Sequence, residues 1–120
     1  MKCDMDLVRQ ILISLEEYEH GLAPQDFQID GYSAEQIGYH VYLMVQADLL
    51  TGVDVTTGDS DSPNWEPESL TWAGHEFLDA SRENTRWKQA KELVGKVGGA
   101  SIAVWTAVLT DLVKQNLGLK

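Results

Sequence analysis

Residues of the types that bind metals occur in this chain, but their spacing does not match the known metal motifs. His75 and Glu76 match the start of the helical zinc-protease motif, whereas Asp79 stands where the second histidine is required. Asp59 and Asp61 begin as the acids of a calcium loop do, but the positions that need glycine and the closing glutamate hold other residues. We therefore expect no metal site, and interpret these acids as a capped helix start and a solvated loop.

The residue types also raise the possibility of a phosphate-binding loop or a catalytic nucleophile. Lys96 lies among glycines in the segment 95–99, but neither serine nor threonine follows it directly and no strand precedes it. Cys3 is the only cysteine, and no serine has the sharp-turn surroundings of a catalytic nucleophile. We expect no catalytic residue, no cofactor and no enzymatic activity, and interpret 95–99 as a joint between helices.

Charge is distributed unevenly along the 120 residues. The chain has 9 Lys and Arg against 19 Asp and Glu, a formal net charge of -10, and neither Lys nor Arg occurs between Arg9 and Arg82. The first eighty residues hold 16 of the acids, whereas the last forty hold 7 of the basic residues. An acidic body repels phosphate, so the charge argues against binding to nucleic acid or anionic lipid.

The sequence also bears on the compartment. A single cysteine allows no disulfide within the chain, which fits a reducing environment. No stretch approaches the roughly 18 apolar residues of a membrane span, and charges interrupt the first ten residues. We expect a cytoplasmic protein that does not enter a membrane.

Hydrophobic periodicity predicts an α+β fold. In order, it predicts a helix over about residues 4–20, a short strand over 26–30, a helix over 33–48, strands at 53–55 and 70–72, a helix over about 74–97 and a last helix within 100–117. A polar loop, 56–69, joins the two later strands. Ser33 with Gln36 has the spacing of a capping box, and Ser101 is expected to cap the last helix.

Aromatic and histidine residues give further expectations about burial. Trp72, Trp87 and Trp105 lie on apolar stripes and are expected in the core. Trp65 lies in the acidic loop, where it either folds back onto the sheet or anchors a partner, and the sequence leaves both open. The histidines His20 and His40 are expected at the surface or at helix ends.

Two segments, GYSAEQIGYHVYLMVQADLL and LTWAGHEFLDASRENTRWKQAK, indicate a more specific arrangement. A helix followed by two strands joined by a loop is the order of a winged helix, and the chain resembles, over about residues 5–115, a bacterial and prophage family of small winged-helix-like proteins of unknown function. The resemblance implies one winged-helix-like domain over 1–120, with an added C-terminal helix. It implies no reaction and no catalytic residues. The short interval before Ser33 leaves little room for the middle helix of a full helix-turn-helix.

The resemblance and the charge together suggest a non-enzymatic protein-interaction module of phage or prophage accessory type. Its acidic face would dock on a basic surface of a partner protein, in the extreme as a mimic of DNA. The expected partner-binding residues are Glu35, Tyr39, Asp48, Asp54, Asp59, Asp61, Trp65, Glu66 and Glu68.

A DNA-binding transcriptional regulator is the alternative function. It would use the basic segment 82–96, in which the residues available for phosphate are Arg82, Arg86, Lys88 and Lys91. The competing interpretation of this segment is a solvated helix face that pairs with the acidic body.

The last helix is apolar on one side and small on the other. The small face consists of Ala103, Thr106, Ala107 and Thr110, and helices of this kind are usually covered on both sides. We expect this face to form a homodimer interface, the alternative being a monomer in which the helix packs wholly inside the fold.

Overall fold

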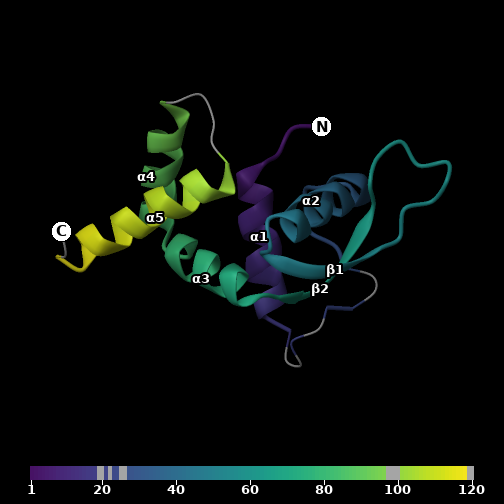
Figure 1. Ribbon diagram of the computed structural model, residues 1–120, viewed down its shortest axis with the longest axis horizontal. Helices are drawn as coiled ribbons and strands as arrows, with labels where there is room; N and C mark the ends of the chain where they lie inside the picture. The colour runs from purple at the N-terminus through teal and green to yellow at the C-terminus, as the bar shows by residue number, and fades with distance from the viewer. Residues whose placement is uncertain (19–20, 22, 25–26, 97–100, 119–120) are drawn as a thin grey trace. The chain divides into compact units, whose positions relative to one another are not determined.

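The structure is a computed structural model, and it describes residues 1–18, 21, 23–24, 27–96 and 101–118 (Figure 1). These residues form five helices and one two-stranded antiparallel sheet, so the expected α+β class is confirmed. The chain divides into two compact units, the sheet unit Met1–His75 and the helical unit Glu76–Lys120. A single domain over 1–120 stays a prediction.

Helix α1, Met5–Glu16, supplies much of the core of the sheet unit. Asp4 caps it by accepting hydrogen bonds from the backbone N–H groups of Asp6 and Leu7. One face is buried against α2 and β2, through Leu7, Val8, Ile11, Leu12 and Leu15. The helix ends earlier than expected, because Glu17 is already its C-cap, and His20 lies outside the described residues.

The strand expected over 26–30 is absent from its described part. Residues 27–29 have no regular secondary structure, and a turn follows at Asp30, before Gly31 with its positive φ of 89°. Phe27 and Ile29, whose alternation suggested the strand, are instead half-buried without pairing. Phe27 packs edge-on against the ring of Tyr18. None of the described residues between α1 and Ser33 is helical, as the short interval predicted.

Helix α2, Ala34–Gln46, starts as expected. Ser33 and Gln36 form the capping box, with each side chain accepting from the backbone N–H of the other residue. His40 differs from the expectation, since it is 1 % exposed in the core. Its ring accepts from the N–H of Asp4 at 2.8 Å and lies 2.7 Å from the carbonyl oxygen of Gln36, so this histidine joins the start of α1 to α2.

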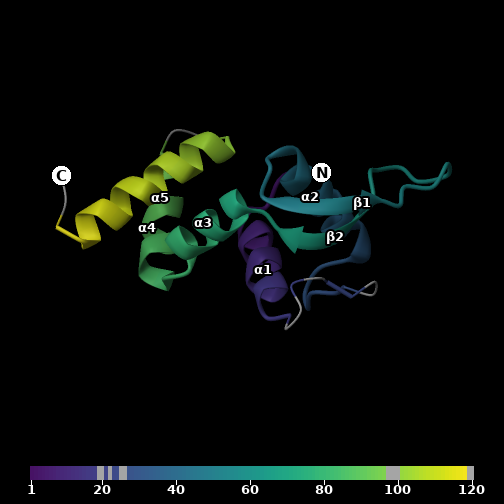
Figure 2. The same cartoon turned by 60° about the horizontal axis from the view of Figure 1, so that its bottom comes forward.

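The two strands are β1, Leu50–Asp54, and β2, Trp65–Leu70, which pair antiparallel with a bulge between Thr51 and Gly52. The polar loop is therefore shorter than expected, because 65–69 belong to β2. Proline and glutamate are rare in strands, and they hid the alternation of β2 in the sequence. We call β1, β2 and the intervening loop 55–64 the wing; the loop extends away from the sheet in both views (Figures 1 and 2).

Helix α3, Trp72–Ser81, begins directly after the sheet. Two residues depart from the expected strand at 70–72: Thr71 lies outside β2, and Trp72 opens the helix with 80 % of its surface exposed. The expectation that Trp72 lies in the core is therefore wrong. Gly74 is buried against the carbonyl of Leu49, where a β-carbon would collide with the backbone.

The expected helix over 74–97 is two helices, α3 and α4, the latter spanning Asn84–Gly95. The break has a local cause. The Glu83 carboxylate accepts from the N–H groups of Thr85 and Arg86, so it caps α4 instead of continuing α3. Both hydrogen bonds favour the charged form, which lowers the pKa of Glu83.

Helix α5, Ile102–Asn116, packs on α4 in the helical unit, and Ser101 caps it as predicted. Trp87 and Trp105 are buried as expected and stack with their ring centroids 4.9 Å apart, and Phe77 meets the edge of Trp87. The buried side of α5 also includes Leu109 and Leu112.

Across the described residues, no helix combines the length and the hydropathy that a membrane crossing requires.

Candidate functional site

The wing separates its acidic residues onto two faces. Neighbouring cross-strand pairs, Asp54 with Trp65 and Val53 with Glu66, point to opposite sides because side chains alternate along a strand. A β-carbon at Gly52 would lie 3.1 Å from the side chain of Val45 in α2, so this residue and the Asp54 pair face the helix. The sequence predicted one acidic face, whereas the structure has a helix-side face and an outer face.

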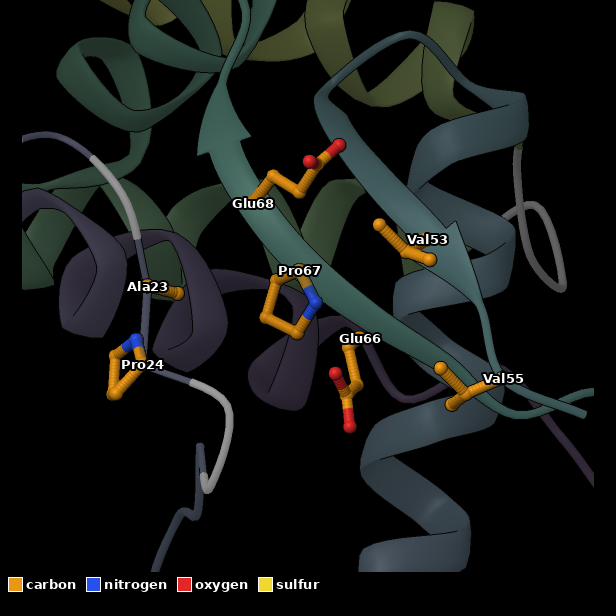
Figure 3. A pocket seen from close by; sticks show the side chains of 7 residues that line it. All are labelled: Ala23, Pro24, Val53, Val55, Glu66, Pro67 and Glu68. Atoms are coloured by element: carbon orange, nitrogen blue, oxygen red, sulfur yellow. The ribbon is translucent and has the colours of Figure 1, made fainter.

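The outer face carries a hollow of about 420 Å³ (Figure 3). Valines and prolines form its apolar wall, and two glutamates flank it. The N–H of Ala23 donates to the carbonyl of Glu68 at 2.9 Å, which holds Ala23 beside β2. The lining residues are Ala23, Pro24, Val53, Val55, Glu66, Pro67 and Glu68.

The helix-side face carries a second hollow, of about 400 Å³, which we call the wing pocket. The rings of Tyr42 in α2 and Trp65 in β2 contribute to its wall, with centroids 6.1 Å apart. Tyr39 continues this aromatic row, since its ring lies 6.1 Å from that of Tyr42. The pocket is lined by Tyr42, Asp54, Thr56, Ser60, Asp61, Ser62, Pro63 and Trp65.

Hydrogen bonds fix the base of the wing loop. Val55 donates its N–H to the carbonyl of Asn64 at 2.9 Å, and the N–H of Asn64 donates to the hydroxyl of Thr56 at 2.9 Å. The side chain of Asn64 packs directly on Gly38 of α2, at a position where no β-carbon fits. The base of the loop is thus attached to the helix that carries Tyr42.

Hydrogen bonds favour the charged form of two wing carboxylates, Asp54 and Asp59. The hydroxyl and the N–H of Thr56 lower the pKa of Asp54, and the hydroxyl of Thr57, 2.8 Å away, lowers the pKa of Asp59. Within the described part of the chain, no salt bridge joins the wing carboxylates Asp54, Asp59, Asp61, Glu66 and Glu68 to a lysine or arginine.

Three of the predicted partner-binding residues lie outside the wing: Glu35, Tyr39 and Asp48. Glu35, at the start of α2, is brought to the loop, because the hydroxyl of Ser62 donates to its carboxylate at 3.2 Å. Asp48 lies beyond the other end of α2, at a positive φ of 62°, and its carbonyl accepts from the hydroxyl of Thr71. The length of α2 separates Asp48 from the loop, so Asp48 does not share a surface with Glu35.

The acidic residues and Trp65 of the two hollows were predicted from the sequence, but most of the other lining residues were missed, among them Tyr42, Val53 and Val55. The spacing of Tyr39 and Tyr42, three residues apart on one helix, was a usable signal for the aromatic row. No local signal shows that Tyr42 meets Trp65, since that contact depends on how the helix packs on the sheet.

The basic segment does not present its four cations together. Arg82 lies before α4 and pairs with Asp79 at 3.0 Å. Arg86 is half-buried: it donates to the carbonyl of Ala80 at 3.2 Å and, with the Asn116 amide oxygen turned toward it, makes two further contacts at 3.0 Å. Lys88 and Lys91 are exposed on α4.

The structure also shows where the residues with metal-binding, nucleophilic or phosphate-binding potential lie. His75, Glu76 and Asp79 are exposed along α3, and no cluster of three possible metal ligands occurs where the chain is described. Desolvation and, secondarily, the Asp4 carboxylate raise the pKa of the Cys3 thiol, which lowers its thiolate fraction and reactivity. Only Gly95 and Lys96 of the 95–99 segment are described.

Comparison with known proteins gives a family but no fold template. The family model described as "Hypothetical protein (DUF2513)" matches residues 2–101, ending at the residue that caps α5. An "Uncharacterized protein" of Haemophilus influenzae is 35 % identical over 97 residues, covering 78 % of this chain and 79 % of the relative. No solved structure matches. The chain therefore belongs to the DUF2513 family.

Proposed function

We propose that this chain is a non-enzymatic protein-interaction module whose wing docks on a basic surface of a partner protein. One observation carries the proposal: both faces of the wing are acidic and hollowed, and their carboxylates form no salt bridge with a described lysine or arginine. Uncompensated surface charge next to apolar hollows suits a partner of opposite charge. Apolar residues such as Val53, 46 % exposed, supply contact area that charge alone does not.

The proposal extends to fold and setting. The order α2, β1, loop, β2 and α3 supports a winged-helix-like arrangement, in which the wing and α2 form the contact region. A phage or prophage accessory protein acting in the cytoplasm is the setting that we propose, as the sequence resemblance implies. A partner that normally binds nucleic acid is the extreme case, with the wing in place of phosphate.

We also propose a role for α5 in self-association. All four residues of its small face, Ala103, Thr106, Ala107 and Thr110, are exposed in the helical unit. Val104 on the same helix is 44 % exposed. An exposed face of alanine, threonine and valine favours close packing of two helices across a two-fold axis.

A DNA-binding regulator is the second candidate, because Lys88 and Lys91 are exposed on α4. Internal contacts weigh against it, since Arg82 pairs with Asp79 and Arg86 bonds to Ala80. A phosphate backbone approaching α4 would have to replace these contacts, and the wing offers it no cation.

Capture of partners from bacterial lysate tests the proposed function. The bait is the full chain, and the matched control is the same chain with all five wing carboxylates neutralised, as D54N, D59N, D61N, E66Q and E68Q. We expect a defined set of basic proteins on the wild-type bait, released by salt and depleted at least about tenfold on the control bait. Nuclease treatment of the lysate should leave this set unchanged.

Two results would contradict the proposal. Equal recovery on both baits would show that the wing is not the contact surface. Recovery that disappears after nuclease treatment would show that nucleic acid bridges bait and prey. Circular dichroism of the neutralised variant checks that its helices are intact; they are expected to be, because four of the five residues are exposed and Glu66 is only partly buried.

A further inference from the structure

We infer that the wing pocket is a binding site for an arginine side chain of the partner protein. The inference rests on the proposed function and deepens it, because it assigns one ligand chemistry to one hollow of the wing. The pocket has a volume of about 400 Å³, within the range of small-ligand sites. A side chain of the partner would enter from solvent between the loop and α2.

The pocket combines the two groups that recognise a guanidinium. Tyr42 and Trp65 supply aromatic rings, with centroids 6.1 Å apart and planes inclined at 47°, and a cation is attracted to the faces of such rings. Asp54 and Asp61 supply carboxylates in the same wall. A guanidinium stacks on aromatic rings and bonds carboxylates in parallel pairs, which the compact ammonium of lysine does not do equally well.

The pocket is built before a ligand arrives. Tyr42 stands on a helix and Trp65 on a strand, and Asp54 is the cross-strand partner of Trp65. The bonds of Val55 and Thr56 with Asn64 close the loop just beyond this pair. Groups held in place in this way lose little conformational entropy on binding, which favours affinity.

The outer hollow lacks this combination. It offers Glu66 and Glu68 beside valine and proline, and none of the described residues that line it is aromatic. It suits an apolar contact with a charged edge, so discrimination between arginine and lysine is expected only in the wing pocket. Glu66 therefore provides a matched control: a carboxylate on the same wing but on the opposite face.

The test is an NMR titration of the full ¹⁵N-labelled chain. The probe is the peptide Ac-Gly-Ser-Arg-Ser-Gly-NH₂, compared with peptides that carry lysine or uncharged citrulline in place of arginine. The Trp65 indole signal is assigned with the variant W65F. We expect saturable shifts of that signal and of the amides around Asp54 and Tyr42, about threefold weaker binding of the lysine peptide and none of the citrulline peptide.

Variants locate the site. D54N and Y42L should each weaken binding of the arginine peptide by about fivefold, whereas E66Q should change it by less than about twofold. D54N is a surface change that preserves the shape of the side chain, so it keeps the test valid even if Y42L disturbs α2. Unchanged amide signals in the apo spectra of the variants show that the fold is retained.

Two outcomes would overturn the inference. Absence of shifts at the Trp65 indole up to about 10 mM peptide would show that the pocket does not bind arginine. Equal binding of arginine and lysine, reduced equally by E66Q and D54N, would show diffuse attraction to the wing. In either case the lysate capture decides separately whether the wing binds a basic protein, so the two failures are distinguishable.

Discussion

The sheet unit and the helical unit are both built on apolar cores, but their surfaces carry opposite charge. Residues 1–75 hold 14 acidic and 2 basic residues, whereas residues 76–120 hold 5 acidic and 7 basic residues. In the sheet unit, the wing carboxylates point to solvent on two faces. In the helical unit, two of the arginines are engaged by neighbouring groups, Arg82 by Asp79 and Arg86 by Ala80.

This difference separates recognition from assembly. A surface with uncompensated charge and shaped hollows is suited to a partner of another kind, whereas an exposed helix face of small residues is suited to a second copy of itself. We therefore propose that the sheet unit binds the partner and that the helical unit mediates self-association. The following predictions each alter one side of this comparison.

The largest effect is expected from Gly74→Ala in the sheet unit. The added β-carbon would collide with the backbone carbonyl of Leu49, which joins α2 to β1 and cannot move as a side chain can. We expect a loss of about 3 kcal/mol in the free energy of unfolding, measured by urea denaturation. Gly95→Ala in α4 is the matched control, because nothing lies within 4 Å of its added carbon. A loss as large in the control would contradict the packing described for the two units.

Binding to nucleic acid is the next test of the charge comparison. At physiological salt, we expect fluorescence anisotropy to show a dissociation constant above about 100 µM for random duplex DNA, because the wing repels phosphate. K88Q and K91Q, which remove the exposed cations of α4, should leave this result unchanged. Micromolar binding that weakens steeply with salt and is lost in these variants would contradict this expectation and favour the DNA-binding regulator as the function.

Self-association concerns the helical unit alone. We expect light scattering at tens of micromolar to give twice the monomer mass of 13.4 kDa. Ala107→Glu should weaken the dimer by about tenfold or more, since it places a charge in the middle of the small face. Ala107 is exposed in the chain described, so the variant should remain a folded monomer with native helix content by circular dichroism. A wild-type mass of 13.4 kDa would exclude the dimer.

The smallest effect concerns the titration of the wing. The Thr56 hydroxyl and N–H lower the pKa of Asp54, so Thr56→Val, which removes the hydroxyl, should raise that pKa toward its ordinary value. A lowered folded pKa stabilises the wing at pH values above the unfolded pKa, and this contribution is lost as pH falls through the folded pKa. Carboxyl NMR titrations of both chains measure the change. An equal Asp54 pKa in the two chains would show that Thr56 does not lower it.

Much of the fold was predictable where the signal is local. The capping box of Ser33 and Gln36, the Ser101 cap and the apolar stripe of α5 each depend on a few adjacent residues, and the structure confirms them. Local signals failed where a neighbour decided the outcome. Pro67 and three acidic or polar residues mask β2, which is a strand because β1 pairs with it.

The candidate site was predictable in composition but not in arrangement. The sequence indicated an acidic region containing Trp65, but the strand register decides that Asp54 and Glu66 lie on opposite faces. The contact of Tyr42 with Trp65 depends on how α2 packs against the sheet, and the hydrophobic periodicity of the sequence does not predict that packing. The exposure of Trp72 likewise follows from where α3 begins.

Site-specific photo-crosslinking in living bacteria tests most directly whether the partner binds the wing. The photoreactive residue p-benzoylphenylalanine is placed at Asp59 in the wing loop or at Gln89 on α4, both exposed positions. We predict that position 59 gives a discrete adduct with a basic protein, identified by mass spectrometry, and that position 89 gives none. An adduct at position 89 without one at position 59 would contradict the assignment of partner binding to the sheet unit.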